Sequence, residues 1–121
     1  LAVRVFANIH RKYQDETPST TLVREFTKRV REQLWPGERL PEVFYDPRSL
    51  ETEGQKRAVL HAKAIVVDAR WTLLTSANFT EAAQERNIEA GVVIDDKRLA
   101  TRVLQQFEQL LEAGDLRRVT M

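Results

Sequence analysis

The sequence predicts an α/β domain, a mixed β-sheet flanked by helices, and two observations carry that prediction. Short segments rich in Val, Ile, Leu and Phe alternate with longer segments whose apolar residues recur every three or four positions. The 121 residues are 42% hydrophobic and 31% charged, which provides apolar side chains for one core. We therefore expect a single domain over residues 1–121.

The first elements are a strand and an amphipathic helix. Residues 1–7, rich in Val and Phe, predict a buried strand. A polar loop over residues 8–17 leads to residues 18–19, Pro and Ser, which are expected to cap a helix that begins near Thr20. Residues 36–37, Pro and Gly, end this helix. Its apolar face is formed by residues four positions apart: Leu22, Phe26, Val30 and Leu34.

The middle of the chain contains the longest predicted strand. Residues 42–45 form a short strand candidate, and residues 46–57 read as a polar loop. Residues 58–67 are apolar apart from His61 and Lys63. This run predicts a long central strand.

A turn and a short helix follow the central strand. Residues 68–70 turn the chain back, and residues 71–75 form the returning strand. Asn78 is a candidate N-cap with Glu81 three residues later, as in a capping box. The pattern predicts a short helix over residues 78–85.

The last two elements are a strand and a helix. Residues 88–94 predict a further buried strand. The final helix is expected to begin at Asp95 or Asp96 and to end at Gly114. Its predicted buried residues are Leu99, Val103, Phe107, Leu110 and Leu111.

Charge and composition limit the possible functions. Nineteen Lys and Arg residues against eighteen Asp and Glu give a net charge of +1, so any binding to a polyanion must be local. Arg24, Lys28 and Arg31 line one face of the first helix, where a solvated surface is favoured over a phosphate contact. The absence of cysteine excludes disulfides, and two histidines do not make the usual zinc site. We expect no cofactor, no membrane partner and a cytoplasmic location.

His61 and Lys63 are the strongest candidates for chemistry. Side chains alternate across a strand, so both point to one side, roughly 7 Å apart, a separation that suits one phosphate. Burying an imidazole and an ammonium in an apolar strand costs free energy unless something pairs with them. His10 and Lys12 have the same spacing, but they lie in a polar loop with no further motif and are interpreted as chance.

The residues after Lys63 complete a longer pattern: four residues lead to Asp68, six more to Thr75, then Ser76 and Asn78. This pattern resembles the His-x-Lys-x4-Asp-x6-Gly-Ser-x-Asn signature of the phospholipase D superfamily, with every spacing kept. The departure is Thr75, where that family usually has Gly. The resemblance implies a phospholipase D-like half-domain and a metal-independent phosphodiesterase.

The resemblance also implies roles for the motif residues. His61 would be either the nucleophile that forms a phosphohistidine or the acid that protonates the leaving oxygen. Lys63 and Asn78 would bind the non-bridging phosphate oxygens, and Ser76 would add a hydrogen bond. Simple N-capping is the alternative role for Asn78, and both roles can coexist at a helix N-terminus.

Two acidic residues complete the predicted site. Residues 78–83 and 86–89 are similar to the bacterial single-motif nucleases of the superfamily, in which an acidic residue eleven positions after the Asn orients the histidine. Glu89 fits that place, and a charge facing water at a strand entry is its alternative. Asp68, at the strand turn, is expected to be structural.

One motif supplies half of a site. Members of this superfamily bring two motifs together because nucleophile and leaving-group acid must stand on opposite sides of the phosphorus. The second half is therefore expected from a homodimer partner or from residues absent here, and we suspect an N-terminally truncated second half of a longer protein. A narrower resemblance, through residues 44–50, 58–63 and 75–89, is to the DrmC family, the phospholipase D-like subunit of the bacterial DISARM anti-phage system. It implies DNA and defence-complex subunits as partners and the bacterial cytoplasm as the setting.

Three functions remain open at this point. The leading hypothesis is a nuclease-like phosphodiesterase that acts on nucleic acid in anti-phage defence. The alternatives are a phospholipase that acts on lipid phosphodiesters and a non-catalytic DNA-binding or scaffold subunit that retains the phosphate pocket.

Overall fold

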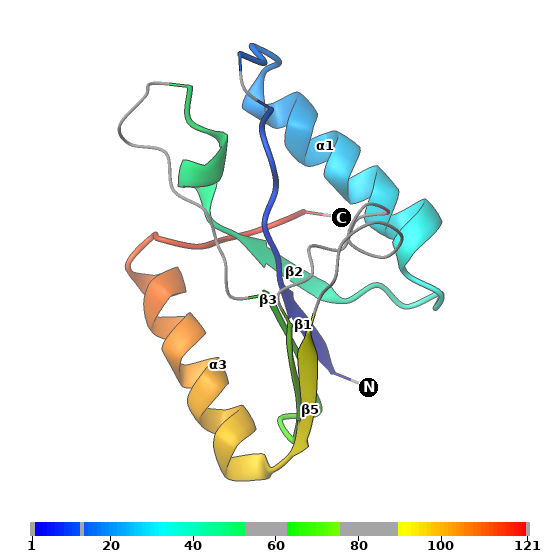
Figure 1. Cartoon of the computed structure of the whole chain (residues 1–121), viewed down its shortest axis with the longest axis vertical. Helices are drawn as coiled ribbons and strands as arrows, with labels where there is room; N and C mark the ends of the chain where they lie inside the picture. The colour runs from blue at the N-terminus through cyan, green and yellow to red at the C-terminus, as the bar shows by residue number, and fades with distance from the viewer. Residues whose placement is uncertain (1, 13, 53–62, 76–89, 121) are drawn as a thin grey trace.

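The computed structural model describes residues 2–12, 14–52, 63–75 and 90–120. Helices lie on both faces of a mixed sheet, which confirms the predicted α/β fold class (Figure 1). The elements, in chain order, are β1 (Val3–Phe6), α1 (Ser19–Arg29), the π-helical turn η1 (Val30–Leu34), β2 (Glu42–Tyr45), the 3-10 turn η2 (Pro47–Leu50), β3 (Lys63–Val67), β4 (Trp71–Thr75), β5 (Gly91–Asp95), α3 (Lys97–Glu112) and β6 (Arg117–Arg118).

The sheet has the strand order β5-β4-β3-β1-β2-β6. β1 and β2 are parallel, with Phe6 beside Phe44, because the chain crosses over through α1 between them. All other neighbours are antiparallel, and β1 pairs with β3 so that Phe6 lies opposite Ala64. The strand that carries Lys63 therefore lies in the interior of the sheet.

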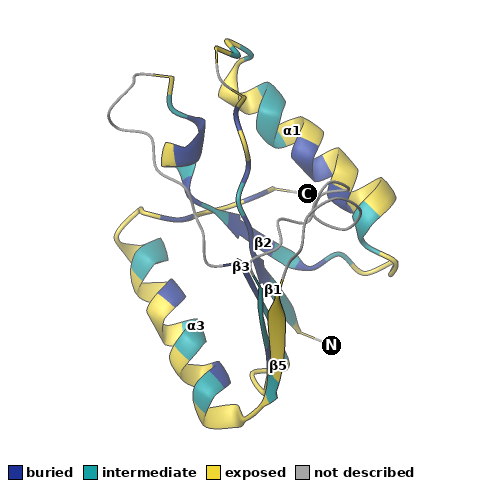
Figure 2. Ribbon diagram, viewed as in Figure 1, coloured by how far each residue is buried: buried dark blue, intermediate teal, exposed yellow. Residues whose placement is uncertain are grey.

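Two apolar clusters hold the helices on the sheet (Figure 2). The cluster under α1 contains Val5, Ala7, Ile9, Phe26, Val30, Val43, Leu50 and Val119, and Ile65 packs against it. The cluster under α3 contains Phe6, Phe44, Ala64, Val66, Ala100, Phe107 and Leu116. We call these sides of the sheet the α1 face and the α3 face. Strand residues alternate between them, which is the period of two that the sequence analysis assumed.

The two helices match their predicted spans with differences at the caps. α1 begins at Ser19, one residue earlier than expected, and Pro18 is the N-cap without a side-chain hydrogen bond. At α3 the Asp96 carboxylate accepts a hydrogen bond of 3.0 Å from the Leu99 N–H, as an N-cap does. Gly114, with φ +82°, follows the C-cap Ala113. Phe107 is buried as predicted, whereas the prediction overlooked Ala100, and Leu99, Val103, Leu110 and Leu111 are half-buried.

The prediction of a buried strand over residues 88–94 is wrong for the part that is described. Gly91–Asp95 is a terminal strand of the sheet, and Val92 and Val93 are 50% and 63% exposed. A valine-rich run fits an edge strand as well as an interior one, so the sequence pattern does not distinguish them. β6 was not predicted, because two arginines carry no apolar signal; its register places Arg118 opposite Phe44.

The predicted turn after β3 is confirmed. Asp68 and Ala69 have φ values of 53° and 49°, in the left-handed region. Next to the turn, Arg70 donates two hydrogen bonds, of 2.6 and 2.9 Å, to the Asp95 carboxylate. This hydrogen bond lowers the pKa of Asp95, and the pair links the turn to the edge strand β5.

Thr72 provides a test of core packing on the α3 face. Its side chain is fully buried, and its hydroxyl has no hydrogen-bond partner among the residues that the structure describes. An unsatisfied buried hydroxyl costs about 1–3 kcal/mol, so Thr72→Val should raise the free energy of unfolding by about 1 kcal/mol. Urea unfolding would measure this change in the free energy of unfolding, provided that the m-value is the same in both proteins. Thr27→Val is the control, because the Thr27 hydroxyl donates to the Val23 carbonyl at 2.8 Å; equal stabilisation of both variants would contradict the explanation.

Candidate functional site

Lys63 is the described member of the predicted catalytic pair. It opens the described part of β3, and although it is charged and lies at a strand end, it is 4% exposed. Strand alternation places its side chain on the α1 face, the side to which Ile65 also points. The lysine predicted to bind phosphate is therefore held in the protein rather than extended into solvent.

Three strand ends meet beside Lys63. Lys63 lies opposite Thr75, the last residue of β4, and Thr75 lies opposite Gly91, the first residue of β5. The three residues form one row across the sheet, which we call the motif row. Paired residues of antiparallel strands have side chains on the same face, so Lys63 and Thr75 share the α1 face.

The motif row also explains how a threonine fits where the superfamily usually has glycine. Its hydroxyl donates a hydrogen bond of 3.3 Å to the Ala90 carbonyl, which ties the end of β4 to the start of β5. Opposite Thr75 stands Gly91, and a Cβ at Gly91 would lie 3.2 Å from the Thr75 side chain and from the Leu74 carbonyl. The glycine at position 91 thus provides the space that the Thr75 side chain occupies.

Asp68 lies at the other end of β3. It lies five positions after Lys63, which corresponds to roughly 16 Å along a strand. Its carboxylate accepts a hydrogen bond of 2.7 Å from the Ala2 N–H, and its own N–H donates to the Ala2 carbonyl at 2.8 Å. Asp68 thus holds the start of the chain beside the turn, and it is not part of the motif row.

The other predicted site residues, His61, Ser76, Asn78 and Glu89, lie outside the described residues, as do the predicted helix over 78–85 and the first part of the predicted central strand. In the sequence they adjoin the motif row. His61 comes two residues before Lys63, Ser76 follows Thr75, and Glu89 comes two residues before Gly91. Their roles stay predictions.

The second His-x-Lys sequence lies in the loop after β1. His10 and Lys12 are exposed, whereas Arg11 between them is buried. Sequence reasoning overlooked Arg11, because one charged residue in a polar loop gives no periodic signal. The basic residues Arg24 and Lys28 on α1 and Arg31 on η1 are exposed.

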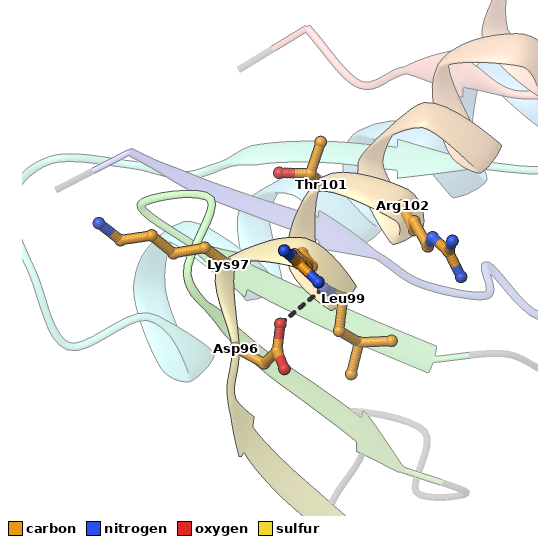
Figure 3. Close-up of a pocket in the computed structure, with 6 residues that line it drawn as sticks. Asp96, Lys97, Leu99, Thr101 and Arg102 are labelled. Carbon is orange, nitrogen blue, oxygen red and sulfur yellow. Dashed lines mark hydrogen bonds between the residues drawn. The ribbon is translucent and has the colours of Figure 1, made fainter.

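The first turn of α3 lines a hollow in the described surface. The hollow has a volume of about 610 Å³, and its lining includes the capping Asp96 and the basic residues Lys97, Arg98 and Arg102. Figure 3 shows the Lys97 and Arg102 side chains pointing away from Asp96. Asp96 directly follows Asp95, which pairs with Trp71, and Trp71 pairs with Val67. These paired residues lie at the end of the strands opposite to the motif row.

Within the described part of the chain, no helix is long and apolar enough to cross a membrane.

Comparison with known proteins identifies the family. The family model described as "Cardiolipin synthase, PLD-like domain" matches residues 9–111, which is most of the chain. Proteins called phospholipase D from Rickettsia felis and Rickettsia bellii are 39% and 41% identical to it over 49 residues, or 40% of this chain. The match covers 24% of each relative, so the chain spans about a quarter of their length.

A solved structure shares the fold. Nuc from Salmonella typhimurium, a phospholipase D family member, superposes with a TM-score of 0.52 over 99% of this chain and 82% of that chain, at 21% sequence identity. The resemblance inferred from the His61-to-Asn78 spacing agrees with both comparisons. The chain belongs to the phospholipase D-like family, as a member of the domain type described for cardiolipin synthase.

Proposed function

We propose that this chain forms one half of a metal-independent phosphodiesterase site, with His61 and Lys63 as its reacting and phosphate-binding groups. The observation that supports the proposal is the motif row. Lys63, buried at 4% exposure, lies beside Thr75, which lies beside Gly91. The three segments of sequence that contain the predicted site residues therefore join the sheet at the same end of the neighbouring strands β3, β4 and β5.

The chemistry follows from what each group can do. The imidazole of His61 attacks phosphorus and forms a phosphohistidine, or protonates the leaving oxygen, and a second copy of the motif performs the other task. The Lys63 ammonium and the Asn78 amide bind the non-bridging oxygens, on which negative charge grows in the transition state, and Ser76 adds a donor. Glu89 accepts the second imidazole N–H and so fixes the tautomer of His61.

We propose nucleic acid as the substrate, with the second motif supplied by a homodimer partner or by a part of the protein beyond this sequence. Support comes from residues 78–89, which are similar to the superfamily's bacterial nucleases. The names of the family model and of the Rickettsia relatives favour lipid as the second candidate. The likeness of residues 44–50, 58–63 and 75–89 to the DISARM subunit supports a role in bacterial anti-phage defence, with complex subunits as further partners.

Two assays in EDTA would test substrate and catalysis together. The protein is incubated with a labelled single-stranded or duplex oligonucleotide and, in parallel, with phosphatidylcholine and cardiolipin vesicles. We expect cleavage of the oligonucleotide and no release of lipid headgroups; the reverse would favour the phospholipase. An acid-labile phosphohistidine, trapped by alkaline quenching, would exclude the scaffold alternative. DNA binding with a steep salt dependence but without cleavage or trapping would support that alternative.

A further inference from the structure

We infer that Arg11 is a positioning residue of the phosphodiester site, acting through the loop that lies beside Lys63. The expected effect of Arg11 on kcat rests on the proposed function. The expected effect of Arg11 on the loop rests on its burial and its hydrogen bonds. Arg11 is 2% exposed although it lies in a polar loop. A guanidinium is buried in this way when fixed acceptors surround it.

The guanidinium joins three segments of the chain. Its Nε donates to the Leu50 carbonyl at 2.8 Å, at the end of η2. Its Nη1 donates to the carbonyls of Asp15 and Thr17 at 2.7 and 2.6 Å, which closes its own loop. Its Nη2 donates to the Ser19 hydroxyl at 3.1 Å, at the first residue of α1.

The loop that Arg11 fixes begins beside Lys63. β1 runs antiparallel to β3 with Phe6 opposite Ala64, so the chain leaves β1 at the end of the sheet where Lys63 begins the described part of β3. Ala7 and Ile9 are buried at 2% and 3% exposure in the cluster on the α1 face, the face of the Lys63 side chain. The chain then reaches Arg11 two residues later.

The second connection runs through η2. The Ser49 hydroxyl donates to the Ile9 carbonyl at 2.8 Å, so η2 is tied to the loop at a second point besides the bond from Arg11 to Leu50. Along the chain, η2 is the described element immediately before the segment that leads to Lys63. Arg11 therefore cross-links η2 to the loop after β1, and this loop begins at the end of the sheet where Lys63 lies.

The geometry requires an arginine. A guanidinium is planar and presents five N–H groups in fixed directions, and here it meets four acceptors from three segments. A lysine ammonium is a single point on a flexible stem and cannot reach acceptors on all sides. Arg11→Lys should therefore keep the charge and lose the cross-link.

The test compares Arg11→Ala and Arg11→Lys with Val66→Ala, a large-to-small change in the α3-face cluster at a residue that is 2% exposed. Hydrolysis of bis-p-nitrophenyl phosphate in EDTA and amide hydrogen exchange at residues 63–66 are measured for each variant. We expect kcat of both Arg11 variants to fall by roughly 10²-fold, because small misplacements in an active site have effects of that size. Millimolar guanidinium should restore much of the activity of Arg11→Ala and none in Val66→Ala.

The outcomes separate this inference from the proposed function. A wild-type protein that hydrolyses nothing in its complete assembly, with both motifs present, would refute the proposed function, and hydrogen exchange would then decide on Arg11. Faster exchange at Lys63 and Ala64 in Arg11→Lys than in an equally destabilised Val66→Ala supports the cross-link. Equal exchange rates at Lys63 and Ala64 in Arg11→Lys and Val66→Ala would overturn the inference about Arg11. Equal activity per folded molecule in the Arg11 variants and Val66→Ala, with no rescue of Arg11→Ala by guanidinium, would overturn it as well. Arg11→Lys keeps the test valid if Arg11→Ala does not fold.

Discussion

Replacing His61 with alanine is expected to lower the hydrolysis of a model phosphodiester in EDTA by roughly 10³-fold or more. The proposed mechanism requires this residue to form a covalent bond to phosphorus or to protonate the leaving oxygen, and acid–base catalysis alone contributes about 10²–10⁴-fold. The measurement is kcat/KM for bis-p-nitrophenyl phosphate with the protein in its complete assembly. His61→Asn should be equally inactive, because an amide is neither nucleophile nor acid near neutral pH.

The chain contains its own control for this experiment. It has two histidines, and the other, His10, also stands two residues before a lysine. His10 is exposed in the loop after β1 and is not followed by the rest of the motif. We expect His10→Ala to keep wild-type kcat. If His10→Ala lost activity and His61→Ala kept full activity, His10 rather than His61 would be the catalytic histidine.

The sheet was predictable where the apolar pattern was local. Residues 42–45 and 71–75 were predicted as strands with the bounds that the structure gives, because polar residues or turns border both segments. The end of the last helix was predictable for a similar reason, since Gly114 adopts the left-handed conformation that glycine favours there.

Strand neighbours were not predictable from the same pattern. Val92 and Val93 appeared to belong to a buried strand, yet β5 is at the edge of the sheet in the described part of the chain, and both valines are at least half exposed. Burial depends on which strands pair, and pairing is set by the register between distant segments. β6 was missed because two arginines carry no apolar signal, and its pairing with β2, Phe44 with Arg118 and Tyr45 with Arg117, joins distant segments of the chain.

Some features of the candidate site were likewise predictable from the sequence, and others were not. The spacing from His61 to Asn78 identified the family, because a motif of polar residues at fixed offsets needs no knowledge of the fold. The register that places Lys63, Thr75 and Gly91 in one row needed the sheet. Sequence reasoning also had no means of relating Thr75 to Gly91, sixteen positions later, or of finding Arg11, whose four acceptors come from three segments.

Replacing Lys63 with methionine should lower kcat by about 10²–10³-fold, the effect of removing one donor to a developing oxyanion. Methionine has a similar length and no charge, so it fills most of the space of the lysine stem in a site that is 4% exposed. KM should rise as well, because in the proposed mechanism the ammonium also binds the phosphate in the ground state. Steady-state kinetics on the oligonucleotide and on the small diester would separate the two effects.

Burial makes the Lys63 experiment specific. Lys63 is buried beside Thr75, whereas Lys97 is exposed in the first turn of α3 (Figure 3). Lys97→Met should therefore leave kcat unchanged, although both variants remove one positive charge and weaken long-range attraction of a polyanion to a similar extent. Lys63→Arg should restore little activity, because a larger planar group does not fit the place of a buried ammonium. If Lys63→Met keeps full activity and unfolds at the wild-type urea concentration, the lysine is not needed for catalysis, and the phosphate must be bound by other residues.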